Sequence, residues 1–206
     1  MPGSPTNTTR SFTGEINNGT YTYSVVETDS VTDPSSGGND WNLIGNPYPS
    51  AISLDDFLST NYNGGTGDIT NAVYFYVRSG GSLTSGQYET YTSGDNIYIG
   101  SAQGFFVEAL NDGTVSFTNA MRDGDNTTFR SSSNNHQVAY FHLEGNGLSD
   151  AFRVYIDANA SDGVDYVYDI SKMYNWNGFN AYTSIDDRDF VFQSIEPINF
   201  NQSKRI

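Results

Sequence analysis

The chain has 206 residues, a formal net charge of −15, a pI near 4.1 and 15% aromatic residues. Such an acidic surface repels nucleic-acid phosphates and anionic headgroups, so neither nucleic acid nor membrane insertion is expected, and no apolar run could span a bilayer. The absence of cysteine excludes disulfides, thiolate metal sites and a cysteine nucleophile.

The N-terminal segment is polar and predicts a disordered or linker region over residues 1–10. It lacks the basic region and apolar core of a signal peptide. The first predicted strand follows, where Tyr21, Tyr23 and Val25 alternate with polar residues. Asn18-Gly19, just before it, is a hairpin-turn signal.

The next predicted strand covers residues 41–44 and ends at a proline corner. Pro47 and Pro49 fix φ and remove two backbone donors, so neither a helix nor a regular strand can continue through them. Tyr48 is held at the tip of this corner. We expect it to brace the corner from the core, and the alternative is an exposed ring that meets a ligand.

Beyond the corner, Ser53 is a good N-cap for one short helix. The apolar run at 72–77 is continuous, which indicates a central strand buried on both faces. Short strands separated by turns predict an all-β, antiparallel β-sandwich of jelly-roll type with at most one or two short helices. A single domain over 11–206 is favoured, and a composition shift near 131–136 marks an alternative boundary. The remaining strands are predicted at 88–91, 97–99, 102–109, 114–117, 137–143, 152–156 and 189–195.

The chain offers little catalytic chemistry. His136 and His142 share one face of a predicted strand but lie roughly 20 Å apart, too far for one metal. The carboxylate pairs Asp55-Asp56 and Asp186-Asp187 could serve glycoside hydrolysis in principle, but an acidic chain contains such pairs by chance. The sequence therefore predicts no enzyme.

The best metal-binding pattern is a run of oxygen-bearing side chains after the strand that ends near residue 156. Oxygen ligands at alternate positions around a glycine are what calcium requires, although Gly163 falls one place late for an EF-hand. Calcium is the one cofactor that this pattern suggests, and an Asx-rich turn is the favoured alternative. The candidate ligands are Asp157, Asn159, Asp162, Asp165 and Asp169.

Four aromatic residues are candidates for a ligand-binding platform: Trp41, Tyr48, Trp176 and Phe179. Flat rings suit the faces of pyranose sugars, and acidic side chains accept hydrogen bonds from hydroxyls. Packing of these rings in a sandwich core is the favoured alternative.

Several motifs together resemble a region of large secreted surface proteins of Bacteroidetes. Trp41 to Ile52 resembles a GWNLIGNPYPSAI signature, with Asp40 in place of its glycine. Asn71 to Phe75, Gln103 to Val107 and Phe117 to Arg122 follow in the order of that family, and Phe129-Arg130 and Tyr168 to Lys172 come after them.

This resemblance implies export by the type IX secretion system and display on the cell surface or release. In the family this region stands ahead of a C-terminal sorting domain, so the chain is expected to be a fragment of a longer precursor. The expected function is a non-catalytic stalk, spacer or adhesion module. A carbohydrate-binding module, with surface glycans as partners, is one alternative. A self-assembling structural protomer of a surface filament is the second, and neighbouring domains of the parent protein are further expected partners.

Overall fold

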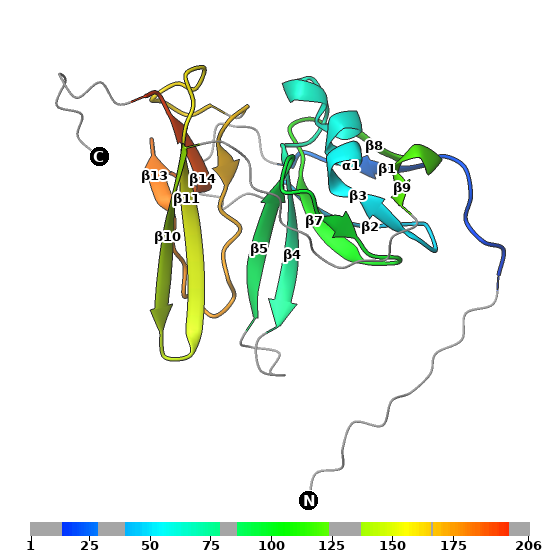
Figure 1. The fold of residues 1–206 in the computed structure, drawn as a ribbon, viewed down its shortest axis with the longest axis horizontal. Helices are drawn as coiled ribbons and strands as arrows, with labels where there is room; N and C mark the ends of the chain where they lie inside the picture. The colour runs from blue at the N-terminus through cyan, green and yellow to red at the C-terminus, as the bar shows by residue number, and fades with distance from the viewer. Residues whose placement is uncertain (1–13, 29–39, 79–85, 124–136, 166, 198–206) are drawn as a thin grey trace, which may run out of the picture.

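A computed structural model describes residues 14–28, 40–78, 86–123, 137–165 and 167–197 (Figure 1). Short strands dominate these residues, together with one α-helix and two single turns of 3-10 helix. The strands are β1 (Tyr21–Val25), β2 (Trp41–Gly45), β3 (Ala51–Ser53), β4 (Ala72–Arg78), β5 (Gly86–Thr92), β6 (Tyr98–Ile99), β7 (Gly104–Glu108), β8 (Gly113–Phe117), β9 (Arg122–Asp123), β10 (Gln137–Gly145), β11 (Leu148–Ile156), β12 (Ile170–Ser171), β13 (Thr183–Ile185) and β14 (Arg188–Ile195); the helices are α1 (Leu54–Asn61), η1 (Asn63–Gly65) and η2 (Asn119–Met121).

A four-stranded sheet in the order β2-β7-β4-β5 forms the middle of the molecule. Side chains of β4 alternate between its two faces, as the pleat of a strand requires. Val73 and Phe75 enter one hydrophobic cluster, whereas Ala72 and Tyr74 enter another. The predicted central strand buried on both faces is therefore confirmed at β4.

The larger cluster lies between this sheet and a layer made of α1, the β1-β8 pair and the β6-β3-β9 sheet. Helix α1 begins as predicted, because the Ser53 hydroxyl accepts a hydrogen bond from the Asp56 amide. Phe57 on its buried face packs against the rings of Phe105 and Phe117. These contacts fix the helix on the sheet.

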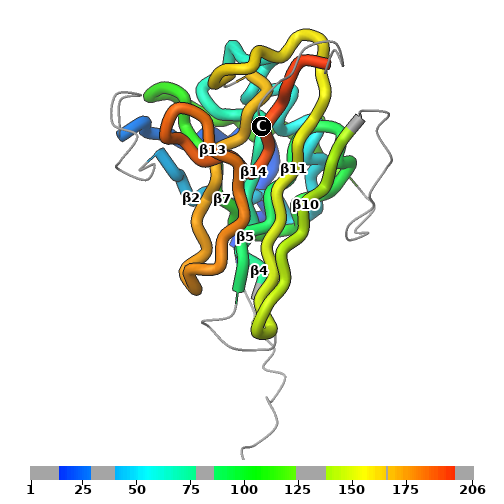
Figure 2. Tube along the Cα trace, turned by 90° about the vertical axis from the view of Figure 1, so that its left-hand side faces the viewer, coloured from blue at the N-terminus to red at the C-terminus, as the bar shows by residue number. Residues whose placement is uncertain are grey.

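The opposite face of the middle sheet is covered by a sheet in the order β10-β11-β14-β12, with β13 also paired to β14. Figure 2 looks onto this C-terminal layer, with the middle sheet behind it. All its pairings are antiparallel except that of β11 with β14, which is parallel. The smaller cluster fills the space between the two sheets and includes Ile170, Val191 and Phe192.

The predicted all-β, antiparallel, sandwich-like fold with one short helix is confirmed. Two features go beyond that prediction, namely the parallel β11–β14 pair and the covering of the middle sheet on both faces. The hairpin predicted from Asn18-Gly19 is wrong, because β1 pairs with the distant β8 and no strand precedes it among the described residues. The linker at 1–10, the boundary at 131–136, His136 and Phe129-Arg130 lie outside the described residues.

The proline corner is built around a buried asparagine. The amide nitrogen of Asn46 donates to the carbonyls of Ser50, Ile99 and Gly100, and its Oδ1 accepts from the Tyr48 amide at 2.9 Å. Tyr48 is 1% exposed, and its hydroxyl donates to the Gly19 carbonyl at 2.6 Å. The corner therefore replaces the ladder bonds that the prolines remove, and Tyr48 braces it from within.

Substitution of Asn46 by Ala should destabilise the fold by about 2–4 kcal/mol, because buried carbonyls would lose their donor. Tyr48→Phe removes one hydrogen bond and should cost only about 1 kcal/mol. Urea unfolding measures both values. Leu43→Ala on the exposed face of β2 is the control and should change the free energy of unfolding by less than about 0.5 kcal/mol. Equal costs for Asn46→Ala and Leu43→Ala would contradict this account of the corner.

A carboxyl group is buried where the middle sheet meets the C-terminal layer. Glu108 on β7 bonds to Ser171, while its Oε2 atom has no hydrogen-bond partner within the described residues. Burial raises the pKa of Glu108 to about 7, the Asp40 charge adds to this rise, and the Ser171 bond opposes it. The folded protein therefore holds this proton more tightly than the unfolded chain does.

Stability should consequently fall as the pH rises from 4.5 through 7, by on the order of 3 kcal/mol from this group alone. Glu108→Gln removes the titration, so the variant should gain stability over wild type at pH 8 and gain little at pH 4.5. Denaturant unfolding at the two pH values measures the difference. Glu144→Gln, at an exposed position, is the matched control. A gain for Glu108→Gln that is the same at both pH values would refute the linkage.

Candidate functional site

The structure separates the four predicted platform residues. Trp41 is half-buried and packs edge-on against Tyr74, with ring centroids 4.6 Å apart, in the smaller hydrophobic cluster. Tyr48 lies in the larger cluster and cannot stack on a sugar, because its ring is covered. Only Trp176 presents its ring to solvent, with 84% of its surface exposed.

Trp176 sits at the tip of a turn that a buried neighbour holds rigid. Asn175 donates from its backbone to Asn180 Oδ1 at 2.7 Å and from its amide to the Phe179 carbonyl at 3.0 Å. Its Oδ1 accepts from the Tyr88 amide of β5 at 2.8 Å, and its carbonyl accepts from Gly178. The turn is therefore fixed internally and also tied to the edge of the middle sheet.

The following residues complete this turn. Asn177 donates to the Gly86 carbonyl and accepts from the Phe179 amide. Gly178 adopts φ +75°, a conformation that glycine favours. Phe179 is half-buried and contributes its backbone groups rather than an exposed ring. The sequence prediction of Phe179 as a platform is therefore not supported by its position.

Tyr88 is the partner of Trp176 that the sequence analysis missed. The indole Nε1 donates to the Tyr88 hydroxyl at 3.2 Å. The Tyr88 ring in turn contacts Tyr76 and Phe106, with centroids 5.2 and 5.9 Å away. Tyr88 thus anchors the exposed indole to the smaller hydrophobic cluster. The sequence placed Tyr88 on a predicted strand at 88–91, but no local pattern indicated its long-range contact with Trp176.

Three of the predicted calcium ligands, Asp157, Asp165 and Asp169, accept hydrogen bonds from backbone amides. Asp157 Oδ1 accepts from the Asn159 amide at 2.8 Å, as in an Asx turn. Asp169 is buried, which raises the pKa of its carboxyl group, and its two oxygens accept from the backbone of Ser194 and Asp165. With Asp162, these residues form no cluster of three or more metal-ligating acidic or histidine side chains within the described ranges. The geometry supports the Asx-turn interpretation.

The other acidic pairs have structural roles. Asp186 and Asp187 both adopt positive φ in the two-residue turn between β13 and β14. Asp55 lies in the first turn of α1, and its carboxylate accepts from the Gly94 amide at 2.6 Å. His142 is exposed on β10 and lies 3.6 Å from Glu144. None of these groups is arranged with a nucleophile in a described cavity.

The described residues thus form an all-β module that presents the exposed indole of Trp176 on a hydrogen-bonded turn. The chain belongs to the domain family DUF8693, described as a domain of unknown function, which it matches over residues 1–206. No curated protein and no solved structure matches the chain. Among the described residues, no helix is long and apolar enough to cross a membrane.

Proposed function

We propose that the chain is a non-catalytic adhesion module of a secreted bacterial protein, and that it binds surface glycans through Trp176. The motif resemblance and the acidic composition support the extracellular setting and export by the type IX system. The roles found for the histidine and for the carboxylate pairs support a binding function rather than catalysis. A plain stalk or spacer is the alternative within the same class.

The rigid presentation of Trp176 is the observation that carries this proposal. An indole that is 84% exposed gains little from burial, yet four hydrogen bonds through Asn175 hold its turn in one conformation. A fixed aromatic ring loses little conformational entropy when a ligand stacks on it, so its affinity benefits from preorganisation. A spacer requires neither the exposed ring nor the brace beneath it.

Wild-type protein should bind a subset of structures on a glycan array, and Trp176→Ala should weaken that binding about tenfold or more. The melting temperature should stay unchanged, because the ring contributes little buried surface. Tyr182→Ala is the matched control, because it also removes an aromatic ring that is partly exposed (40%), and it should bind like wild type. Equal binding by wild type and Trp176→Ala would favour the spacer interpretation.

A filament protomer is a second candidate, because β10 is an edge strand with exposed apolar side chains. It pairs only with β11 among the described strands and contains neither lysine nor proline, which commonly protect an edge. Phe141 and Leu143 lie on the same face and are each 47% exposed. Such an edge favours strand pairing between copies.

If β10 mediates assembly, sedimentation velocity should show a mass that rises with protein concentration. Phe141→Lys should return the protein to a monomer, because a lysine in the paired edge would bring charge into the contact. Val77→Lys, at a 38%-exposed position on β4, is the control and should not alter assembly. A strict monomer at the highest attainable concentration argues against the filament function.

A further inference from the structure

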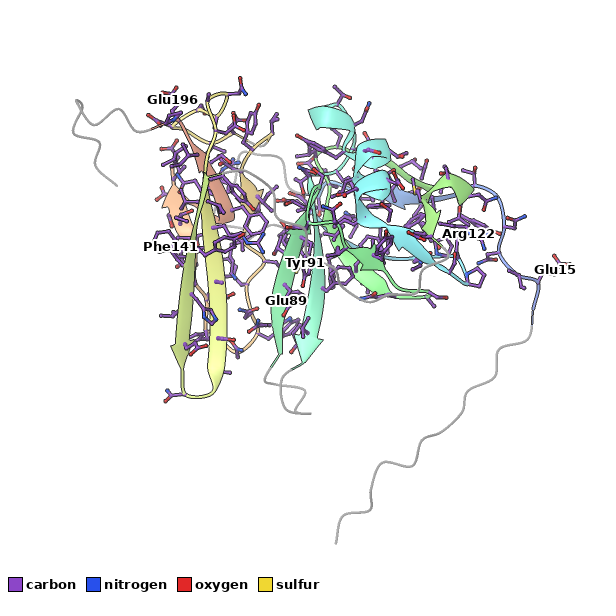
Figure 3. The ribbon with its side chains drawn as sticks, in the orientation of Figure 1. Glu15, Glu89, Tyr91, Arg122, Phe141 and Glu196 are labelled. Carbon is purple, nitrogen blue, oxygen red and sulfur yellow. The ribbon has the colours of Figure 1, made fainter. Side chains whose placement is uncertain are left out.

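A second candidate site lies between the C-terminal layer and the turn that joins β5 to β6. It is a cavity of about 540 Å³, within the usual size range of small-molecule sites. Its lining mixes aromatic rings with polar and charged side chains, and it contains none of the four platform residues named from the sequence. Tyr91 on β5, labelled in Figure 3, is part of the lining, although its ring packs against Phe75 of the larger hydrophobic cluster.

The floor of the cavity is one face of the C-terminal sheet. Strand register places Tyr140, Arg153 and Phe192 in a row across β10, β11 and β14. The neighbouring row on the same face contains Val138, Tyr155 and Ser194. Because side chains of a strand alternate, all six point to the cavity side, and all six line it.

Arg153 is the cationic centre of this floor. Its guanidinium carbon lies 4.5 Å from the Phe192 ring centroid and 5.2 Å from that of Tyr140, both in cation–π geometry. Its Nη1 also lies 3.3 Å from the Tyr155 hydroxyl and 3.6 Å from Asp95 Oδ1. The flat guanidinium is thus held between rings, and its Nη1 group faces the Tyr155 hydroxyl and the Asp95 carboxylate.

The opposite wall is equally fixed. Asp95 Oδ2 accepts from the Thr92 amide at 2.8 Å and from its hydroxyl at 3.3 Å, which closes the β5–β6 turn. Oδ1 of the same carboxylate faces Arg153 across the cavity. Asn71, where β4 begins, adds a buried Oδ1 atom that has no hydrogen-bond partner among the described residues.

We propose that this cavity binds one or two rings of a neutral saccharide. A sugar ring has apolar faces and a rim of hydroxyls. The Tyr140 ring suits such a face, and the planar groups of Arg153, Asp95 and Asn71 suit the rim. The buried Asn71 oxygen needs a donor, and a hydroxyl supplies one. Asp95 and Asp157 outnumber Arg153 in the lining, so an acidic sugar is disfavoured.

This inference rests on the proposed glycan-binding function and gives it a second subsite, chemically different from the single indole of Trp176. Tyr140 is the best residue to test, because it is 65% exposed and its loss should not disturb the fold. Leu143 on the same strand faces the other way and supplies a matched control. Arg153→Lys keeps the charge but loses the flat, stacked geometry.

The test is calorimetric titration of the full chain with cellotriose, xylotriose, maltotriose and chitotriose, and with trigalacturonate as the acidic probe. At least one neutral trisaccharide should bind, and Tyr140→Ala should raise its Kd about tenfold or more. Arg153→Lys should also weaken binding, whereas Leu143→Ala should leave the Kd unchanged.

Three results would overturn the proposal. If Tyr140→Ala and Arg153→Lys both leave the Kd unchanged while Trp176→Ala abolishes binding, the cavity is not a saccharide site and the adhesion function stands. If trigalacturonate binds more tightly than every neutral probe, the assigned ligand class is wrong. If no probe binds wild-type protein and the glycan array is also empty, both the subsite and the adhesion function fail.

Discussion

The burial of β4 on both faces is the constraint on which the rest of the molecule depends. Val73 and Phe75 on one face, with Ala72 and Tyr74 on the other, allow one strand to anchor two hydrophobic clusters. A strand buried on both sides cannot be displaced without exposing both clusters, and apolar burial stabilises by roughly 25 cal/mol per Å². The layer that contains α1 and the C-terminal sheet, on opposite faces of the middle sheet, are therefore both anchored on β4. Both candidate sites lie on the side that the C-terminal sheet covers.

Buried asparagine and aspartate side chains supply the second kind of order. With short strands, many backbone groups have no ladder partner, and each must be satisfied when it is buried. Asn46 serves the proline corner, Asn61 bridges α1 to Ser116, and Asn175 holds the Trp176 turn. In a chain without cysteine, these amides tie together segments far apart in sequence. In the C-terminal layer, a buried ion pair has the same role: Lys172 Nζ, just after β12, lies 2.6 Å from Asp150 Oδ2 on β11.

The sequence predicted those features that depend on local patterns. Strand alternation, the Ser53 cap and the two-face burial of β4 are set by neighbouring residues. Long-range pairing is not set in this way, and two Asn-Gly dipeptides show the difference. Asn146-Gly147 closes the β10–β11 hairpin with both φ angles positive, whereas Asn18-Gly19 precedes a strand that pairs with β8. The row of Tyr140, Arg153 and Phe192 depends on register across three strands, so no local pattern could have identified it.

The two layers around the middle sheet also differ in polarity, and this difference bears on function. The larger cluster is almost wholly apolar, whereas the contact with the C-terminal sheet contains the buried Glu108 carboxyl group and the Arg153 guanidinium with the Asp95 carboxylate that faces it. An apolar contact excludes solutes, but a partly polar one leaves hydrogen-bonding groups that a hydroxylated ligand can satisfy. The larger cluster, between the middle sheet and the layer that contains α1, thus stabilises the fold. The C-terminal layer, whose contacts contain fewer apolar groups and more donors and acceptors, carries both proposed binding sites.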